Sequence, residues 1–88
     1  MALLSFTETE VWYLGYRLTL SPAERRLLAC LAERTEGLDT AALAAAADVA
    51  NGSVASLVRA VNEKAAVIGG RTLILSGRGT GYRLCPFL

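Results

Sequence analysis

The stretch RTLILSGRGTGYRL, residues 71–84, contains the pattern that decides the fold. Two segments rich in branched and aromatic residues, Arg71–Leu75 and Gly81–Leu84, lie on either side of a short glycine-containing run, Ser76–Thr80. Two strand-forming runs joined by a short loop with glycine predict a β-hairpin. We therefore predict a hairpin that places the cation Arg78 at its tip.

A helix is predicted immediately upstream, from Val54 to about Val67. Gly69-Gly70 supplies a stop signal, and Asn51-Gly52-Ser53 supplies a turn in which Ser53 can act as the N-cap. One face of this helix is apolar at helical spacing and is expected to face the core: Val54, Leu57, Val58, Val61 and Ala65. The opposite face is expected to carry Ala55, Ser56, Arg59, Asn62, Glu63 and Ala66, with Lys64 toward one edge.

Two further helices precede that one. Ser21-Pro22-Ala23-Glu24 has the spacing of a capping box with proline at the first helical position, and the helix is expected to run to about Arg34 and stop at Gly37. Its inner face would contain Leu27, Leu28 and Leu31, with Ala23 and Cys30.

The second helix, about Ala41–Ala47, is capped by Asp39 or Thr40. Its alanines suit either a surface helix or close packing, and we favour close packing around Leu43.

The segment Leu3–Leu20 is predicted to form strands. Val11–Tyr13 and Tyr16–Leu20 are rich in strand-forming residues, and Leu14-Gly15 between them suits a tight turn. Strands, three helices and a hairpin in this order predict an α+β winged helix-turn-helix. We expect one domain over residues 1–88, with N-terminal strands at 1–20, a three-helix core at 21–68 and a wing hairpin at 71–85.

The composition restricts the function. The 88 residues contain no histidine and two cysteines, Cys30 and Cys85, outside any paired spacing. We therefore expect no metal site, no cofactor, no small-molecule substrate and no enzyme activity, and we interpret both thiols as buried apolar groups. No apolar stretch approaches the roughly 20 residues of a bilayer span, and no signal peptide is evident, so no membrane association and a cytoplasmic location are expected.

Charge is distributed unevenly along the chain, although the net charge is only +1. Residues 1–50 contain four cations against seven acids, a balance of −3, whereas residues 51–88 contain five cations against one acid, a balance of +4. Such asymmetry suggests that the second half faces a polyanion.

Three motifs resemble one family. Arg78-Gly79-Thr80-Gly81-Tyr82-Arg83-Leu84 resembles the wing of the effector domains of OmpR/PhoB-type response regulators. Leu20-Ser21-Pro22-Ala23-Glu24 followed by Leu27-Leu28 resembles the opening of that family's first helix. Ser53-Val54, with Val58, Arg59, Val61 and Lys64, is similar to its recognition helix. These matches keep the family's order over residues 10–84 and identify the chain as such a domain without a receiver domain.

The resemblance implies a bacterial-type transcriptional regulator that binds double-stranded DNA, with the third helix in the major groove and the wing on the adjacent minor groove or phosphates. A homodimer would supply additional contacts. Candidate DNA-binding residues are Ser53, Ser56, Arg59, Asn62, Lys64, Arg71, Arg78 and Thr80.

Two features differ from the family pattern. The stretch between Leu43 and Val54 is several residues shorter than usual, and Val61-Asn62-Glu63-Lys64 lacks an arginine that members commonly carry. A recognition helix so poor in cations also suits an alternative, a winged-helix module for protein interaction or dimerisation with weak or no DNA binding.

Overall fold

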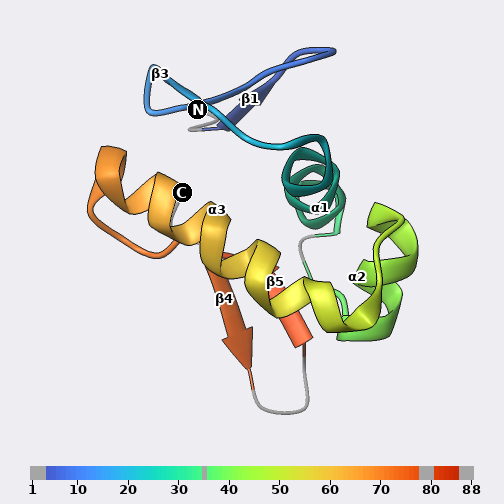
Figure 1. Cartoon of the computed structure of the whole chain (residues 1–88). Coiled ribbons are helices and arrows are strands. Elements are labelled where there is room, and N and C mark those ends of the chain that lie inside the picture. Colours follow the sequence, from blue (N-terminus) through green and yellow to red (C-terminus); the bar gives the residue numbers. More distant parts are fainter. Residues whose placement is uncertain (1–3, 35, 78–80, 86–88) are drawn as a thin grey trace.

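The computed structural model describes residues 4–34, 36–77 and 81–85. An N-terminal sheet is followed by three helices and a C-terminal hairpin, which confirms the predicted winged helix (Figure 1). The strands are β1 (Leu4–Phe6), β2 (Val11–Tyr13), β3 (Tyr16–Leu18), β4 (Ile74–Gly77) and β5 (Gly81–Leu84), and the α-helices are α1 (Pro22–Glu33), α2 (Thr40–Ala47) and α3 (Val54–Gly69).

The N-terminal sheet is antiparallel in the order β1-β2-β3. Leu14 and Gly15 both have positive φ, 53° and 84°, and this left-handed pair closes the β2–β3 hairpin as expected for a two-residue turn. Val11 pairs with Leu18, and both are buried. The third strand ends at Leu18, two residues earlier than predicted, because the chain then leaves the sheet for the cap of α1.

The cap of α1 is the predicted capping box. The Ser21 hydroxyl accepts from the Glu24 amide at 3.2 Å, and the Glu24 carboxylate accepts from the Ser21 amide at 2.8 Å. Leu27, Leu28 and Leu31 are buried as expected. The fourth buried residue of the helix is Glu24, whereas Ala23 and Cys30, assigned to the inner face from the sequence, are only half-buried.

Close packing of α2 is also confirmed. Asp39 caps the helix by accepting from the Ala42 amide at 2.7 Å. Leu43, Ala44 and Ala47 are buried, because alanines allow α2 to approach α1 closely.

The start of α3 differs from the prediction. Ser53 has right-handed helical backbone angles and its side chain makes no capping bond, because a 3-10 turn at Asn51–Ser53 leads directly into the helix. The helix extends to Gly69 and ends at Gly70, whose φ of 70° is readily accessible only to glycine. Its buried face contains Val54, Val58, Val61 and Ala65, while Leu57 is half-buried.

The wing hairpin is formed by β4 and β5, with Ile74 opposite Leu84 and Gly77 opposite Gly81. The strand β4 begins at Ile74 and not at Arg71, since the paired register with β5 starts at Ile74 and Leu84. At its other end, β4 includes Ser76 and Gly77, which the sequence analysis had assigned to the tip of the hairpin. The predicted tip residues Arg78, Gly79 and Thr80 lie outside the described residues.

The second wing strand also pairs on its other edge, with the segment between α1 and α2. Leu38 and Tyr82 exchange two backbone hydrogen bonds, of 2.9 and 2.8 Å. A Cβ on Gly81 would lie 2.2 Å from the Leu38 carbonyl oxygen, and Gly81 has a φ of 81°. Glycine is therefore required at this position for the approach of the two backbones.

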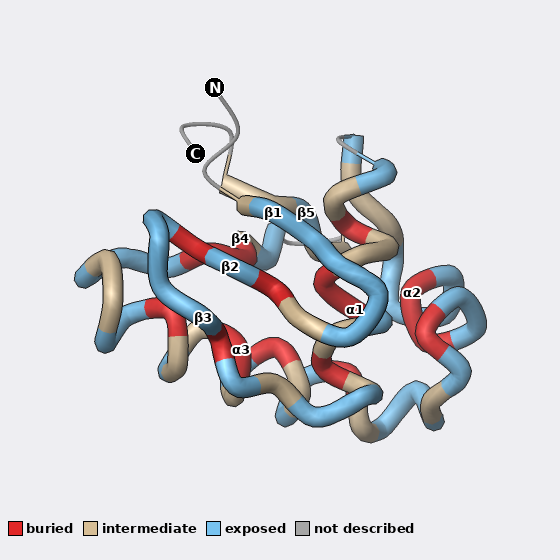
Figure 2. The backbone as a smooth tube through the Cα atoms, turned by 90° about the horizontal axis from the view of Figure 1, so that it is seen from above, coloured by how far each residue is buried: buried red, intermediate tan, exposed pale blue. Residues whose placement is uncertain are grey.

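The core lies between the N-terminal sheet and the helices. One cluster of buried residues joins β2, β3, the three helices and the start of the wing, and Figure 2 marks the buried positions along the backbone. The helix α3 crosses the molecule, with the sheet on one side and the wing on the other (Figure 1). None of the described helices is alone long and apolar enough to cross a membrane; α2 and α3 meet that criterion only together, across a bend of 99°.

Candidate nucleic-acid interface

The outward face of α3 is the surface to which the sequence assigned DNA contacts. Ser56, Arg59 and Glu63 are exposed on it, among the exposed apolar residues Ala55, Ala66 and Val67. The face thus presents one cation and one acid. A helix packed on the core along one side and exposed along the other can enter a groove of DNA, but this one brings little positive charge with it.

A groove of about 420 Å³ separates α3 from the wing. Arg59 lies on its helical wall, and Ser76 and Tyr82 lie on its wing wall. The remaining lining residues are all from α3: Ala55, Val58, Asn62, Glu63 and Ala66. The fold thus brings the exposed cation of α3 next to the hairpin, as a shared binding surface requires.

The side chain of Asn62 is bonded to the backbone of the wing, which the sequence analysis did not predict. Its Nδ2 donates to the Ile74 carbonyl at 3.1 Å, and its Oδ1 accepts from the amides of Leu73 and Ile74 at 3.1 and 2.8 Å. An asparagine side chain has two N–H donors and two acceptor positions, so three of its four positions are engaged. The predicted base contact of Asn62 stays a prediction, and in the described structure the wing engages most of this amide.

Lys64 is likewise engaged inside the protein. Its Nζ lies 2.6 Å from Oε1 of Glu24 on α1. Burial of the Glu24 carboxyl acts to raise its pKa, but hydrogen bonds from Lys64 and the Ser21 amide outweigh burial, so the pKa of Glu24 lies below its ordinary 4.5. The carboxylate is charged at neutral pH and neutralises the ammonium. The predicted phosphate contact of Lys64 stays a prediction, and the described structure gives this ammonium an internal ion pair with Glu24.

The other predicted residues occupy different positions. Ser53 is half-buried at the start of α3, and its carbonyl accepts from the exposed Ser56 hydroxyl at 3.0 Å. Arg71 is exposed just beyond the end of α3. Arg78 and Thr80 fall outside the described residues. The described structure consequently brings Ser56 and Arg59 together on one face and places Arg71 at the far end of the same helix.

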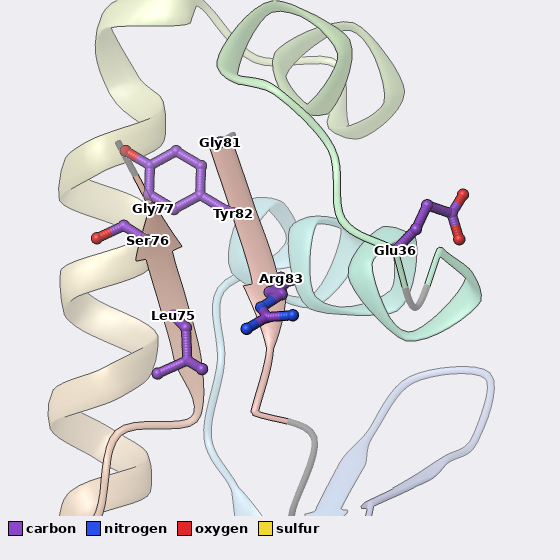
Figure 3. A pocket seen from close by; sticks show the side chains of 7 residues that line it. All are labelled: Glu36, Leu75, Ser76, Gly77, Gly81, Tyr82 and Arg83. Carbon is purple, nitrogen blue, oxygen red and sulfur yellow. The ribbon is translucent and has the colours of Figure 1, made fainter. Parts of the chain in front are cut away.

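The outer side of the wing adds a feature that the sequence analysis did not single out. Leu75 and Arg83 are register partners whose side chains project from the same side of the hairpin (Figure 3). They line a hollow of about 480 Å³ together with Glu36, Ser76, Gly77, Gly81 and Tyr82. Arg83 is exposed, and the alternation of Gly81–Leu84 could have identified it as an outward cation of the second strand.

Comparisons with known proteins identify the fold. No protein-family model and no curated protein matches the sequence. The crystal structure of the DNA-binding domain of the response regulator AdeR, in complex with an intercistronic region, superposes with a TM-score of 0.83 at 19% identity, covering 96% of this chain and 95% of that one.

A second solved structure comes from a family of redox sensors in the streptococci that evolved from two-component response regulators. It superposes with a TM-score of 0.82 at 22% identity and covers 97% of this chain. The present chain spans only 40% of that protein. The fold is thus the one found in response-regulator DNA-binding domains, as the three sequence motifs predicted.

Proposed function

We propose that this chain binds double-stranded DNA through the outward face of α3 and the wing, and that it acts as a transcriptional regulator. One observation supports this most strongly. Arg59 is exposed on α3 beside the wing groove, in a fold whose counterpart in AdeR was crystallised with an intercistronic region. Among the described residues no acid forms an ion pair with Arg59.

In this proposal α3 enters the major groove, whose width admits an α-helix. The Arg59 guanidinium would donate two parallel hydrogen bonds to guanine or bind a phosphate, and Ser56 would add a hydroxyl donor beside it. Arg71 would contact a phosphate near the end of the helix. Arg78 and Thr80 are retained as wing contacts on the basis of the sequence resemblance alone.

The number of available cations predicts weak binding by one copy. With Lys64 paired to Glu24, Arg59, Arg71 and Arg78 remain from the predicted set. Three phosphate contacts correspond to a slope of about −2.7 in log affinity against log salt, from about −0.9 per contact. A homodimer on two half-sites would double the contacts, and we propose that the functional form is such a dimer.

Fluorescence anisotropy tests the proposal with a labelled duplex pool of mixed sequence and with duplexes selected from it. We expect Arg59→Ala to weaken binding about tenfold and to make the salt slope shallower. Arg17→Ala is the matched control, because this substitution also removes one positive charge, but from the N-terminal sheet, where Arg17 pairs with Glu10. Equal binding by the wild type and Arg59→Ala would contradict the proposal.

A second candidate function, a module for protein interaction, is favoured by apolar exposure near one end of α3. Val67 is 87% exposed, Tyr16 65% and Leu14 40%. Leu14 lies against Gly69, since a Cβ on that glycine would be 3.1 Å from the Leu14 side chain. Sedimentation velocity combined with the anisotropy assay separates the two functions. A dimer that binds no duplex would favour the interaction module, and a strictly monomeric chain that binds DNA tightly would argue against it.

A further inference from the structure

The wing is attached to the rest of the protein along both of its edges. On the β5 edge, Leu38 and Tyr82 form the two-bond backbone bridge. On the β4 edge, the only side-chain hydrogen bonds from α3 among the described residues come from Asn62, which binds both the amide and the carbonyl of Ile74 and the amide of Leu73. We propose that Asn62 is a positioning residue that sets the angle between α3 and the wing.

The orientation of the amide follows from its partners. One atom of the amide faces two backbone N–H groups and the other faces a carbonyl, so only an oxygen at the first position and a nitrogen at the second satisfies all three. Aspartate could reproduce the two bonds to N–H groups but would set a carboxylate against the Ile74 carbonyl.

The hydrogen bonds from Asn62 matter for the wing because their backbone partners belong to buried residues. Leu73 and Ile74 are 0% and 1% exposed, so the side chains at this end of β4 are held within the core. Their amides bond to Asn62, and the Leu73 carbonyl accepts from the Cys85 amide at 2.9 Å. Removing the side chain of Asn62 would leave two interior amides without their protein partners, which favours a different path for the start of β4.

The consequence for recognition rests on the proposed function. Arg59 belongs to α3, and Ser76 and Tyr82 belong to the wing, yet all three line one groove. Asn62 lies one helical turn from Arg59 on the same face, and its hydrogen bonds reach the other wall. This residue therefore determines how far apart the two binding elements lie, without itself being a contact to DNA.

Hydrogen exchange measured by NMR tests the proposal without DNA. In Asn62→Ala, we expect the amides of Leu73 and Ile74 to exchange at least about tenfold faster relative to the α1 amides of Leu27 and Leu31. Asn62→Asp should give a smaller acceleration, because it keeps both acceptor bonds. Glu63→Gln, at the adjacent exposed position, should leave exchange in β4 unchanged.

Two results would overturn the proposal at this stage. One is that the amides of Leu73 and Ile74 in Asn62→Ala exchange at the same rate as in the wild type. The other is an acceleration equal to that of the α1 amides, which would indicate general destabilisation and not release of the wing.

A second measurement separates positioning from contact. Asn62 is neutral, so loss of a direct base contact would weaken binding to a duplex without changing its salt slope. Release of the wing would remove phosphate contacts made elsewhere and make the slope shallower, which is the result we expect for Asn62→Ala. Weaker binding with an unchanged slope would contradict the positioning role. A wild type that binds no DNA would contradict the proposed function, while the exchange experiment still decides the role of Asn62.

Discussion

The Nζ of Lys64 on α3 lies 2.6 Å from Oε1 of Glu24 on α1, and the same carboxylate accepts from the Ser21 amide. One oxygen thus caps α1 and links it to α3. The Glu24 side chain is 7% exposed and that of Lys64 is 41% exposed, so the carboxylate is interior and the ammonium is partly in water. Lys64, one of the four cations that the sequence analysis assigned to DNA, thus joins two helices.

Lys64→Met should destabilise the fold because it leaves the buried Glu24 carboxylate without its cation. We expect a loss of about 1–2 kcal/mol at pH 7, less than for a fully buried pair because Lys64 reaches solvent. Thermal unfolding followed by circular dichroism measures it. Arg17→Met is the control, since its exposed pair with Glu10 should contribute no more than about 1 kcal/mol.

The effect of Lys64→Met should depend on pH in a defined direction. Because the pKa of Glu24 is below 4.5 in the folded chain, its contribution to stability is complete above pH 4.5 and is lost as the pH falls through the folded value. The difference in Tm between wild type and Lys64→Met should therefore shrink between pH 5 and the acid limit of folding. A difference that stays constant over that range would refute the linkage.

Gly81→Ala should disrupt the attachment of the wing. The new Cβ would lie 2.2 Å from the Leu38 carbonyl oxygen on a backbone with φ of 81°, so both a steric clash and a conformational penalty oppose it. We expect a loss of more than about 2 kcal/mol in urea unfolding. Gly52→Ala is the matched control, since nothing lies within 4 Å of its Cβ position. Similar stability of the two variants would show that the close approach at Leu38 is not required.

Lys64→Met also separates the two roles of a cation in α3. Because Lys64 is already neutralised by Glu24, its removal should leave the salt slope of DNA binding unchanged, whereas Arg59→Ala should reduce it by about 0.9. Both slopes can be measured by anisotropy between about 50 and 300 mM salt, a range over which salt screens exposed charges strongly. A shallower salt slope for Lys64→Met would show that Lys64 does contact a phosphate, as the sequence analysis predicted.

The thiol of Cys30 should react slowly. Burial and the nearby carboxylate of Glu33 raise its pKa above the ordinary 9.0, with a smaller opposing effect from Arg26. Less thiolate is therefore present at pH 8 than for an exposed cysteine. In a Cys85→Ser background, alkylation by iodoacetamide should be slower in the folded chain than in urea. Equal rates would mean that the fold does not protect Cys30.

Local patterns accounted for much of the fold. The capping box at Ser21 and Glu24, the apolar spacing of Val54, Val58, Val61 and Ala65, and the turn at Leu14-Gly15 each depend on residues a few positions apart. Interactions over such distances are visible in the sequence, because they follow the periods of helix, strand and turn. The end of α3 at Gly70 is likewise a local feature that the sequence shows.

The candidate site was predicted less completely, since side-chain partners come from distant parts of the chain. Helical periodicity set Asn62 on the face of α3 opposite the core, among the candidate DNA contacts, and it could not show that Leu73 and Ile74 would occupy its amide. Lys64 and Glu24 are 40 residues apart in sequence, and no local rule joins them.

Local sequence patterns were sufficient to predict which segments form helices and strands, the caps of α1 and α2, and the positive charge of the second half of the chain. The tertiary structure alone decided which of those polar groups remain available. Packing α3 between α1 and the wing places Lys64 against a buried carboxylate and Asn62 against two interior backbone amides. These groups pair with one another because leaving a buried polar group without a partner is costly. Arg59, with no such partner among the described residues, is the side chain that this packing leaves facing outward.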